Sequence, residues 1–370
     1  MVLSWQIGVE IELIAPQGLS RETLASKLRP KTGKVDRIFH VQSELSKASG
    51  VSVFDNLTVG FAVLDSSGKL IAKCVEDITL KRDLQQDIPA KAGWYRIVSD
   101  DRRFLELIIQ QCDPNTCLSE VLNPIAKLFD TQPQSGAGNM IKVVDRNGSP
   151  IAIATPLSGE RERPCEIITP PLQNNYRARL SYLLSAAREL NFTIPDEGAT
   201  HIHFDATPLA DTRIFRNLVN LFWTYREVLR QLVGTNFNCR RLGKIPQPLF
   251  ELVNDYSFQQ LSWSAAKVQL KQLKLSKYCD FNFKNLVNDL PNKYTLEARI
   301  FPVWLEAKSI IMAAELIEGM LNLAIDTKYV AAHEPLVWDL EQVQNFLSQM
   351  PLDAATYKFW IDKAISITGI

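Results

Sequence analysis

Ionisable residues that alternate with apolar ones mark four segments of this 370-residue chain, and they restrict its fold more than any other feature. In the first segment, Glu10 and Glu12 alternate with apolar residues. Because successive side chains of a β-strand point to opposite faces, this alternation predicts a half-buried strand over residues 5–14. The other three segments are CEIITPPL at 165–172, THIHFD at 200–205 and TLEARIFP at 295–302.

The rest of the chain shows strand-like and helix-like periodicities in irregular alternation, without regular βαβ units. Strands are predicted at 58–64, 69–74, 140–145, 150–155, 164–169, 200–206, 279–283 and 294–301. Helices are predicted at 20–29, capped by Ser20, and at 101–111, 117–129, 173–190, 211–233, 258–273, 304–325, 338–348 and 353–367. This order favours an α+β architecture with a largely antiparallel sheet.

The charge balance and the hydropathy pattern argue against several classes of protein. Lys and Arg together number 41, as do Asp and Glu, whereas proteins that bind nucleic acid or anionic membranes normally carry a basic excess. The best candidate for a membrane span, residues 309–325, is interrupted by Glu315 and Glu318, and the N-terminus has no signal-peptide pattern. The six cysteines include no C-x-x-C pair. We therefore expect a cytoplasmic protein with reduced thiols and without nucleic-acid or membrane partners.

Taken singly, each charged segment is more typical of a solvated strand face or a neighbour salt bridge than of a functional site. Together, however, the four segments supply Glu, His and Arg where solvated faces favour Lys, Thr and Ser. Same-face neighbours in a strand lie about 6.5–7 Å apart, so paired carboxylates can hold separate cations. Such a carboxylate-rich set favours Mg²⁺ or Mn²⁺ over zinc, and its members should repel one another when no cation is bound.

An acidic metal-binding floor with nearby arginines suits a nucleoside triphosphate, because cations bridge the phosphates and arginine holds the transferring group. The glycine-containing loop QPQSGAGN at 132–139 is not a phosphate-binding fingerprint, since it precedes a strand and lacks a following helix. Any ATP would therefore be held by side chains and metal.

Read in chain order, the motifs resemble those of the putative amidoligase family, a branch of the glutamine synthetase and γ-glutamylcysteine ligase superfamily of carboxylate–amine ligases. They are GVEIE at 8–12, Glu166 followed by PPL at 170–172, His201-x-His203 and Glu297-x-Arg299. The resemblance covers residues 5–15 and 140–305. It implies a glutamine-synthetase-like fold, in which helices pack on the outer face of a curved, largely antiparallel sheet.

The resemblance also implies roles for individual residues. The metal ligands would be Glu10, Glu12, Glu166, His201 and Glu297. ATP would contact His201, His203, Arg240, Arg241 and Arg299. Arg299 and Arg241 would be the catalytic arginines that stabilise the phosphoryl group, with Arg240 competing with Arg241 for the phosphate contact.

The chain departs from the family pattern in two places. About 120 residues between the first strand and the Glu166 motif match nothing in the family, so we expect a single catalytic domain over 1–370 with an insertion of unknown fold at about 16–138. A helical C-terminal region is expected at about 304–370. In addition, Ala298 stands between Glu297 and Arg299 where the family more often has an aromatic residue, which affects packing rather than chemistry.

The activity implied by the resemblance is an ATP-dependent ligation that needs Mg²⁺ or Mn²⁺. A carboxylate substrate would be activated as an acyl phosphate and captured by an amine substrate, either of them a small molecule or a peptide. Two alternatives stay open. One is a phosphotransferase on the same fold, which would release the phosphorylated acid; the other is an inactive member that binds a nucleotide or a peptide.

Overall fold

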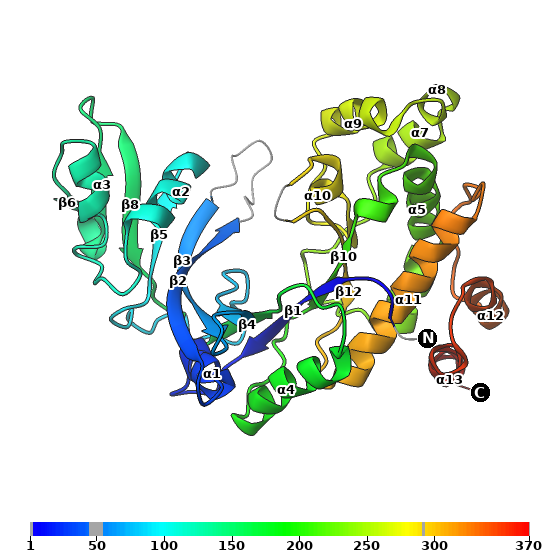
Figure 1. Cartoon of the computed structure of the whole chain (residues 1–370), viewed down its shortest axis with the longest axis horizontal. Helices are drawn as coiled ribbons and strands as arrows, with labels where there is room; N and C mark the ends of the chain where they lie inside the picture. The colour runs from blue at the N-terminus through cyan, green and yellow to red at the C-terminus, as the bar shows by residue number, and fades with distance from the viewer. Residues whose placement is uncertain (1–2, 44–54, 291–292, 370) are drawn as a thin grey trace. The chain divides into compact units, whose positions relative to one another are not determined.

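The computed structural model describes residues 3–43, 55–290 and 293–369, and the chain forms two compact units (Figure 1). The first unit comprises Met1–Ile11, Pro171–Leu184 and Glu197–Ile370. The second unit comprises Glu12–Pro170 and Ser185–Asp196. Strand β1 (Ile7–Ile14) and helix α4 (Tyr176–Glu189) each contribute residues to both units.

The first unit contains an antiparallel sheet with the strand order β11-β12-β10-β1. Strand β10 (Thr200–Asp205) lies between β1 and β12 (Thr295–Phe301), and the short β11 (Phe281–Asn282) pairs with β12. Every second residue of these strands is apolar and fully buried: Ile7, Val9, Ile202, Phe204, Leu296, Ala298 and Ile300. One face of the sheet is therefore apolar, and the charged residues of the motifs share the opposite face.

Helices α5 (Thr212–Thr224) and α6 (Arg226–Val233) follow β10 in the first unit. A single helix was predicted here, but Tyr225 adopts a non-helical backbone conformation that separates the two. Helix α5 packs against α11 (Ala307–Asp326), and α6 packs against β12. The unit also contains η2 (Thr207–Leu209), α7 (Gln247–Asn254), α8 (Tyr256–Gln259), α9 (Trp263–Gln272) and α10 (Lys284–Val287).

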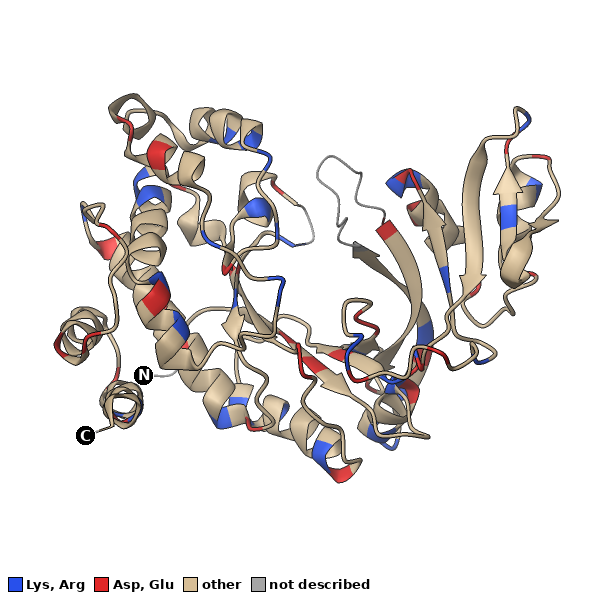
Figure 2. Cartoon of the chain, turned by 180° about the vertical axis from the view of Figure 1, so that it is seen from behind, with Lys and Arg blue, Asp and Glu red and all other residues tan. Residues whose placement is uncertain are grey.

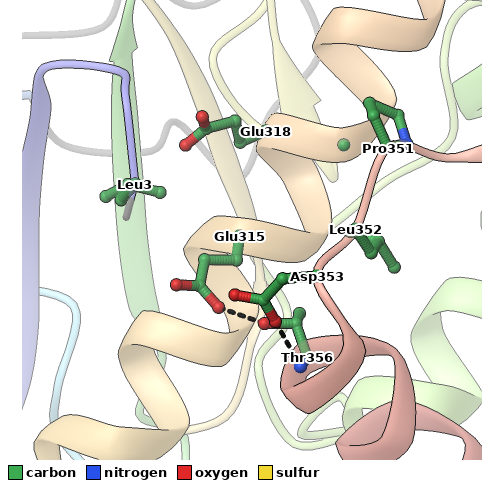
Figure 3. Close-up of a pocket in the computed structure, with 8 residues that line it drawn as sticks. Leu3, Glu315, Glu318, Pro351, Leu352, Asp353 and Thr356 are labelled. Atoms are coloured by element: carbon green, nitrogen blue, oxygen red, sulfur yellow. Dashed lines mark hydrogen bonds between the residues drawn. The ribbon is translucent and has the colours of Figure 1, made fainter. Parts of the chain in front are cut away.

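The predicted C-terminal helices are present as α11, α12 (Leu340–Gln349) and α13 (Ala354–Thr368). The indole of Trp360 is fully buried and donates to the carbonyl of Met312 at 3.1 Å, which joins α13 to α11. The hydroxyl of Thr356 donates to the carboxylate of Glu315. Its backbone N–H donates to the carboxylate of Asp353 at 2.8 Å, which caps α13 (Figure 3). These contacts fix α13 onto α11.

The second unit is built on antiparallel strands in the order β1-β9-β4-β3-β5-β8-β7-β6. At its centre, β3 (Asp55–Leu64) pairs with β2 (Lys34–Ser43) along one edge, while β4 (Leu70–Val75) and β5 (Tyr95–Ser99) share the other. The remaining strands are β6 (Gln134–Ser135), β7 (Ile141–Val144), β8 (Pro150–Pro156) and β9 (Pro164–Ile168). Its helices are α1 (Arg21–Leu28), α2 (Arg102–Gln111), α3 (Asn123–Leu128) and η1 (Ala137–Asn139).

Helix α1 begins where the sequence predicts it. The side chain of Ser20 accepts from the backbone N–H of Thr23, and the hydroxyl of Thr23 accepts from the backbone N–H of Ser20. The first helical residue, Arg21, is fully buried and bonds to Glu76 at 3.2 Å and to the carbonyl of Val59 at 3.0 Å. The bond to Val59 attaches α1 to β3, and α1 also packs against β4.

The predicted α+β class with a largely antiparallel sheet is confirmed, since every strand pairing described is antiparallel. The predicted half-burial of β1 is wrong: seven of its eight residues are buried, including Glu10 and Glu12. A glutamine-synthetase-like curvature with helices on the outer face stays a prediction, as does a single catalytic domain with an insertion at 16–138. Residues 44–54 of that insertion lie outside the described residues.

Acidic and basic residues are interspersed along the helices and strands of both units (Figure 2). None of the helices in the described part of the chain combines the length and the apolar composition that a bilayer crossing requires.

Candidate functional site

Charged side chains meet on one face of the first unit's sheet because the strand registers place them side by side. Glu10 of β1 lies opposite His201 of β10, and His203 of β10 lies opposite Glu297 of β12. Directly opposed residues of antiparallel strands point to the same face, and Arg299, two residues beyond Glu297, shares it. All five residues are buried, with Glu10 the most exposed at 9%.

Four of these residues, Glu10, His201, His203 and Glu297, form what we call the Glu–His cluster. The Nδ1 atom of His201 lies 3.3 Å from Oε2 of Glu10 and 3.6 Å from Oε1 of Glu297. The Nε2 atom of His203 lies 3.1 Å from Oε1 of Glu10 and 3.9 Å from Oε1 of Glu297. Burying an ionised group costs free energy unless the group is paired. In this cluster, the buried ionisable groups of three strands lie close enough to pair with one another.

Two basic side chains compensate the carboxylates of the cluster. The ammonium of Lys293 lies 3.0 Å from Oε1 of Glu10, and Arg299 donates to Oε1 of Glu297. Burial alone would raise the pKa of Glu10, but Lys293 and the two histidines hold it well below the ordinary value. Burial acts on Glu297 in the same way, but Arg299 together with His203, Lys293 and His201 offsets it, so that its pKa is also lowered. Lys293 and Arg299 thus offset the repulsion between these two carboxylates, and the self-repulsion of the whole empty acidic site stays a prediction.

His201 is held in its neutral form. Burial and, second in size, the positive charge of Arg299 lower the pKa of His201 to about 4. Glu10 and Glu297 act in the opposite direction but are outweighed. A neutral imidazole carries one N–H donor and one nitrogen lone pair. At pH 7 His201 can therefore act as a hydrogen-bonding group or as a ligand, rather than as a fixed positive charge.

A second layer of polar residues orients the cluster. Asn282 of β11 donates its side-chain N–H to Oε2 of Glu297 at 2.7 Å. The Nδ1 atom of His203 lies 3.2 Å from the hydroxyl of Thr295, which also accepts from Asn285 at 3.4 Å. Because Nδ1 of His203 is engaged by Thr295, its Nε2 is the atom directed at the carboxylates.

The chemistry of the cluster fits a divalent cation. The ligand atoms of Glu10, His203 and Glu297 all lie within 4.8 Å of one another. The two carboxylates suit Mn²⁺ and Mg²⁺, which favour oxygen ligands, and the imidazole adds one nitrogen ligand. The sequence pattern assigned His203 to the nucleotide only, and the geometry adds it to the candidate metal ligands. His201 stays a predicted ligand.

The other two predicted metal ligands belong to the second unit. Glu12 lies two residues beyond Glu10 on β1 and is fully buried. Glu166 is a half-buried residue of β9 and lies opposite Val75 of β4. Their role as metal ligands stays a prediction.

The predicted phosphate-binding arginines Arg240 and Arg241 lie in the loop after α6. Arg241 is buried and donates to the carbonyl of Glu197 at 3.2 Å, whereas Arg240 is exposed. The loop is held by Gly243, whose backbone exchanges two hydrogen bonds with Asp280, at 3.1 Å and 2.8 Å. Which of the two arginines contacts phosphate stays open, although the loop itself has a fixed attachment beside β11.

A second group of carboxylates, on α11, does not form a comparable site. Glu315 and Glu318 line a small cavity together with Leu352 and Thr356 (Figure 3). Its volume of about 10 Å³ is at the lower limit for one water molecule. The carboxylate of Glu318 accepts from the backbone N–H of Ser4 at 2.9 Å, so these acids serve packing of the N- and C-terminal segments.

Sequence reasoning missed three polar residues of the site. Thr295 could have been found, because it precedes Glu297 by two residues and must share its face of β12. The position of Asn282 beside Glu297 follows only from the pairing of β11 with β12. Lys293 reaches the cluster from the turn before β12, and no periodic signal marks such a residue.

The comparison with protein families gives one match. A family model described as "Putative amidoligase enzyme" matches residues 3–321 of the chain. The matched region contains the whole Glu–His cluster. The curated proteins contain no match to this chain.

Proposed function

Since the chain belongs to the family of putative amidoligases, we propose that it is an ATP-dependent ligase that joins a carboxylate to an amine with the help of Mg²⁺ or Mn²⁺. The observation that carries this proposal is the convergence of Glu10, His203 and Glu297 on one buried face, with Arg299 beside them. A condensation of two charged substrates with a triphosphate requires such a combination of anionic ligands for metal and a fixed cation for phosphate.

The ligands of the divalent cation would be Glu10, His203 and Glu297, with His201, Glu12 and Glu166 as further candidates. When bound, the cation would screen the negative charge of the carboxylate substrate from that of the triphosphate. The cluster itself contributes orientation: Asn282 and Thr295 hold Glu297 and His203 in place before any ligand arrives.

Arg299 would stabilise negative charge on the phosphoryl group as it transfers. The residue is 5% exposed and its guanidinium is bonded to Glu297, so this positive charge is fixed in a buried region of low dielectric constant. In such surroundings a fixed positive charge stabilises a developing negative charge more strongly than in water. Arg241 or Arg240, together with His201, would contact the remaining phosphate groups.

In the proposed reaction, an oxygen of the substrate carboxylate attacks the γ-phosphorus of ATP, and the bond from phosphorus to the β-phosphate oxygen breaks to release ADP. The amine nitrogen then attacks the carbonyl carbon of the acyl phosphate. Inorganic phosphate leaves with the former carboxylate oxygen, and the amine loses a proton to the medium. Activation is needed because an amine and a carboxylate form only a salt at neutral pH.

The test is a screen of carboxylic acids paired with amines, read as ADP release by the full chain. We expect release that requires acid, amine and Mg²⁺ or Mn²⁺ together, and that stops on addition of chelator. Glu297→Gln should reduce the rate at least about 100-fold by removing a metal ligand. The control is Glu306→Gln, an exposed residue just after β12. Release that is unaffected by chelator, or by Glu297→Gln, would contradict the proposal.

A further inference from the structure

Lys293 contacts the Glu–His cluster from outside the three strands that carry it. Its Nζ lies 3.0 Å from Oε1 of Glu10, the same oxygen that lies 3.1 Å from Nε2 of His203. The side chain of Lys293 is 49% exposed, whereas that of Glu10 is 12% exposed. The ammonium thus approaches a buried carboxylate from the solvent side.

A divalent cation held by Glu10 and His203 would lie beside this ammonium, because Nε2 of His203 and Nζ of Lys293 approach the same oxygen of Glu10. Charges of +2 and +1 at about 4 Å repel each other strongly, even where solvent screens them. Binding of the cation to Glu10 and His203 must therefore move the ammonium away. Conversely, the ammonium stabilises the metal-free carboxylate and so competes with the cation.

The two basic residues of the site differ in their freedom to make such a move. The side chain of Arg299 is 7% exposed and belongs to the middle of β12, where Glu297 holds it. Lys293 stands in the turn before β12, attached by its backbone carbonyl to the N–H of Thr295 at 2.9 Å. A lysine carries its compact charge on a flexible four-carbon stem, so a small rotation takes the ammonium several ångströms.

We propose that Lys293 is an exchangeable cation: it holds Glu10 in the metal-free site, yields that position to a divalent cation, and then binds the oxyanion of an incoming substrate. The oxyanion is a phosphate of the nucleotide or the carboxylate of the acid. Lys293 is thereby a positioning residue of the empty site and a substrate-binding residue of the loaded one. This inference rests on the metal site of the proposed function.

The first test uses Mn²⁺ alone, titrated into the full chain and followed by calorimetry or by electron paramagnetic resonance. Lys293→Met keeps the length of the side chain and removes its charge, so we expect it to bind Mn²⁺ at least about 3-fold more tightly than the wild type. Lys293→Arg keeps the charge and should bind like the wild type. Lys284→Met, an exposed residue of α10, is the control for a lysine away from the cluster.

The outcomes separate the two proposals. If the wild type binds no Mn²⁺, the metal site is wrong and this inference falls with it. If the wild type binds Mn²⁺ and Lys293→Met binds it equally or more weakly, only the role of Lys293 is overturned. An unchanged far-UV circular dichroism spectrum for each variant shows that the comparison is between folded proteins.

The second test uses the Mn²⁺-loaded protein. Lys293→Met should weaken binding of a non-hydrolysable ATP analogue about 10-fold if the oxyanion is a phosphate. If the analogue binds normally and the KM of the acid substrate rises by a similar factor, the oxyanion is the substrate carboxylate. If neither changes, Lys293 binds no substrate and this half of the proposal is wrong.

Discussion

Glu10 illustrates how a carboxylate is kept ionised within a sheet. Burial alone would favour its protonated form, yet Lys293 and two histidines lower its pKa well below the ordinary value. The same balance holds for Glu297 with Arg299. Both carboxylates are therefore ionised at neutral pH, so the proposed binding of a cation to Glu10 should depend on displacement of Lys293 rather than on deprotonation of the carboxylates.

Asn282 contacts the candidate metal ligand Glu297, and it should affect metal binding nearly as strongly as the ligands themselves. Asn282→Ala removes the hydrogen bond of 2.7 Å to Oε2 of Glu297. We expect it to weaken Mn²⁺ binding about 10- to 100-fold, because the carboxylate loses the contact that sets its orientation. The measurement is a calorimetric titration of the full chain.

The matched control is Asn288→Ala, which removes an exposed amide of the turn after α10. Equal Mn²⁺ affinities for Asn282→Ala and the wild type would show that Glu297 is oriented by β12 alone. The backbone N–H of Lys284 also bonds to Asn282, so thermal unfolding of both variants should be compared alongside.

At the scale of elements, Asp280 joins α6 to the strand side of the site. Its carboxylate lies 2.5 Å from Nε of Arg226 and 3.1 Å from Nη1 of Arg230, both on α6. Its backbone carbonyl accepts from the N–H of Arg299, and its backbone also bonds to Gly243 of the arginine-bearing loop. A single buried residue thus attaches α6, the loop and β12 to one another.

Asp280→Asn should destabilise the protein by about 3 kcal/mol, because two largely buried arginines each lose an ion pair, and Arg226 keeps only its pair with Glu227. Asp289→Asn is a close control. Asp289 also bridges two basic residues four apart on one helix, Lys267 and Lys271, but it is 43% exposed. That pair of contacts should be worth less than about 1 kcal/mol. Urea denaturation measures both, and equal losses would contradict the role given to Asp280.

Elements with a clear periodicity or a local capping signal could be predicted from the sequence. The strands β1, β10 and β12 alternate clearly, and the cap of α1 by Ser20 is a local signal, so these were found. The break between α5 and α6 at Tyr225 has no proline or glycine to announce it. The partnership of β11 with β12, which brings in Asn282, depends on chain segments far apart in sequence.

The same reasoning explains which site residues could be predicted. Residues that share a strand face with a recognised motif, such as His203 and Glu297, could be assigned to that face because side chains of a strand alternate between its two faces. Lys293 could not, since its position depends on the turn before β12. The burial of β1 on both faces was also missed, because a strand with Glu10 and Glu12 looks half-solvated unless one knows that other charges pair with them.

At the scale of the whole molecule, we propose that the chain forms an amide through an acyl phosphate. The family match extends over residues 3–321, which include segments of both units. The proposed activity is therefore tested on the full chain. The acid and amine identified by ADP release supply the substrates.

The most direct measurement follows the oxygen atoms of the acid. With the acid labelled with ¹⁸O in its carboxylate, one labelled oxygen should appear in inorganic phosphate for each amide formed, because the amine expels phosphate from carbon. Arg299→Ala should slow this transfer by about 10²- to 10³-fold, as expected for loss of one stabilising positive contact. A labelled phosphorylated acid without amide would identify a phosphotransferase instead. Label in AMP, with no ADP formed, would contradict the acyl-phosphate mechanism.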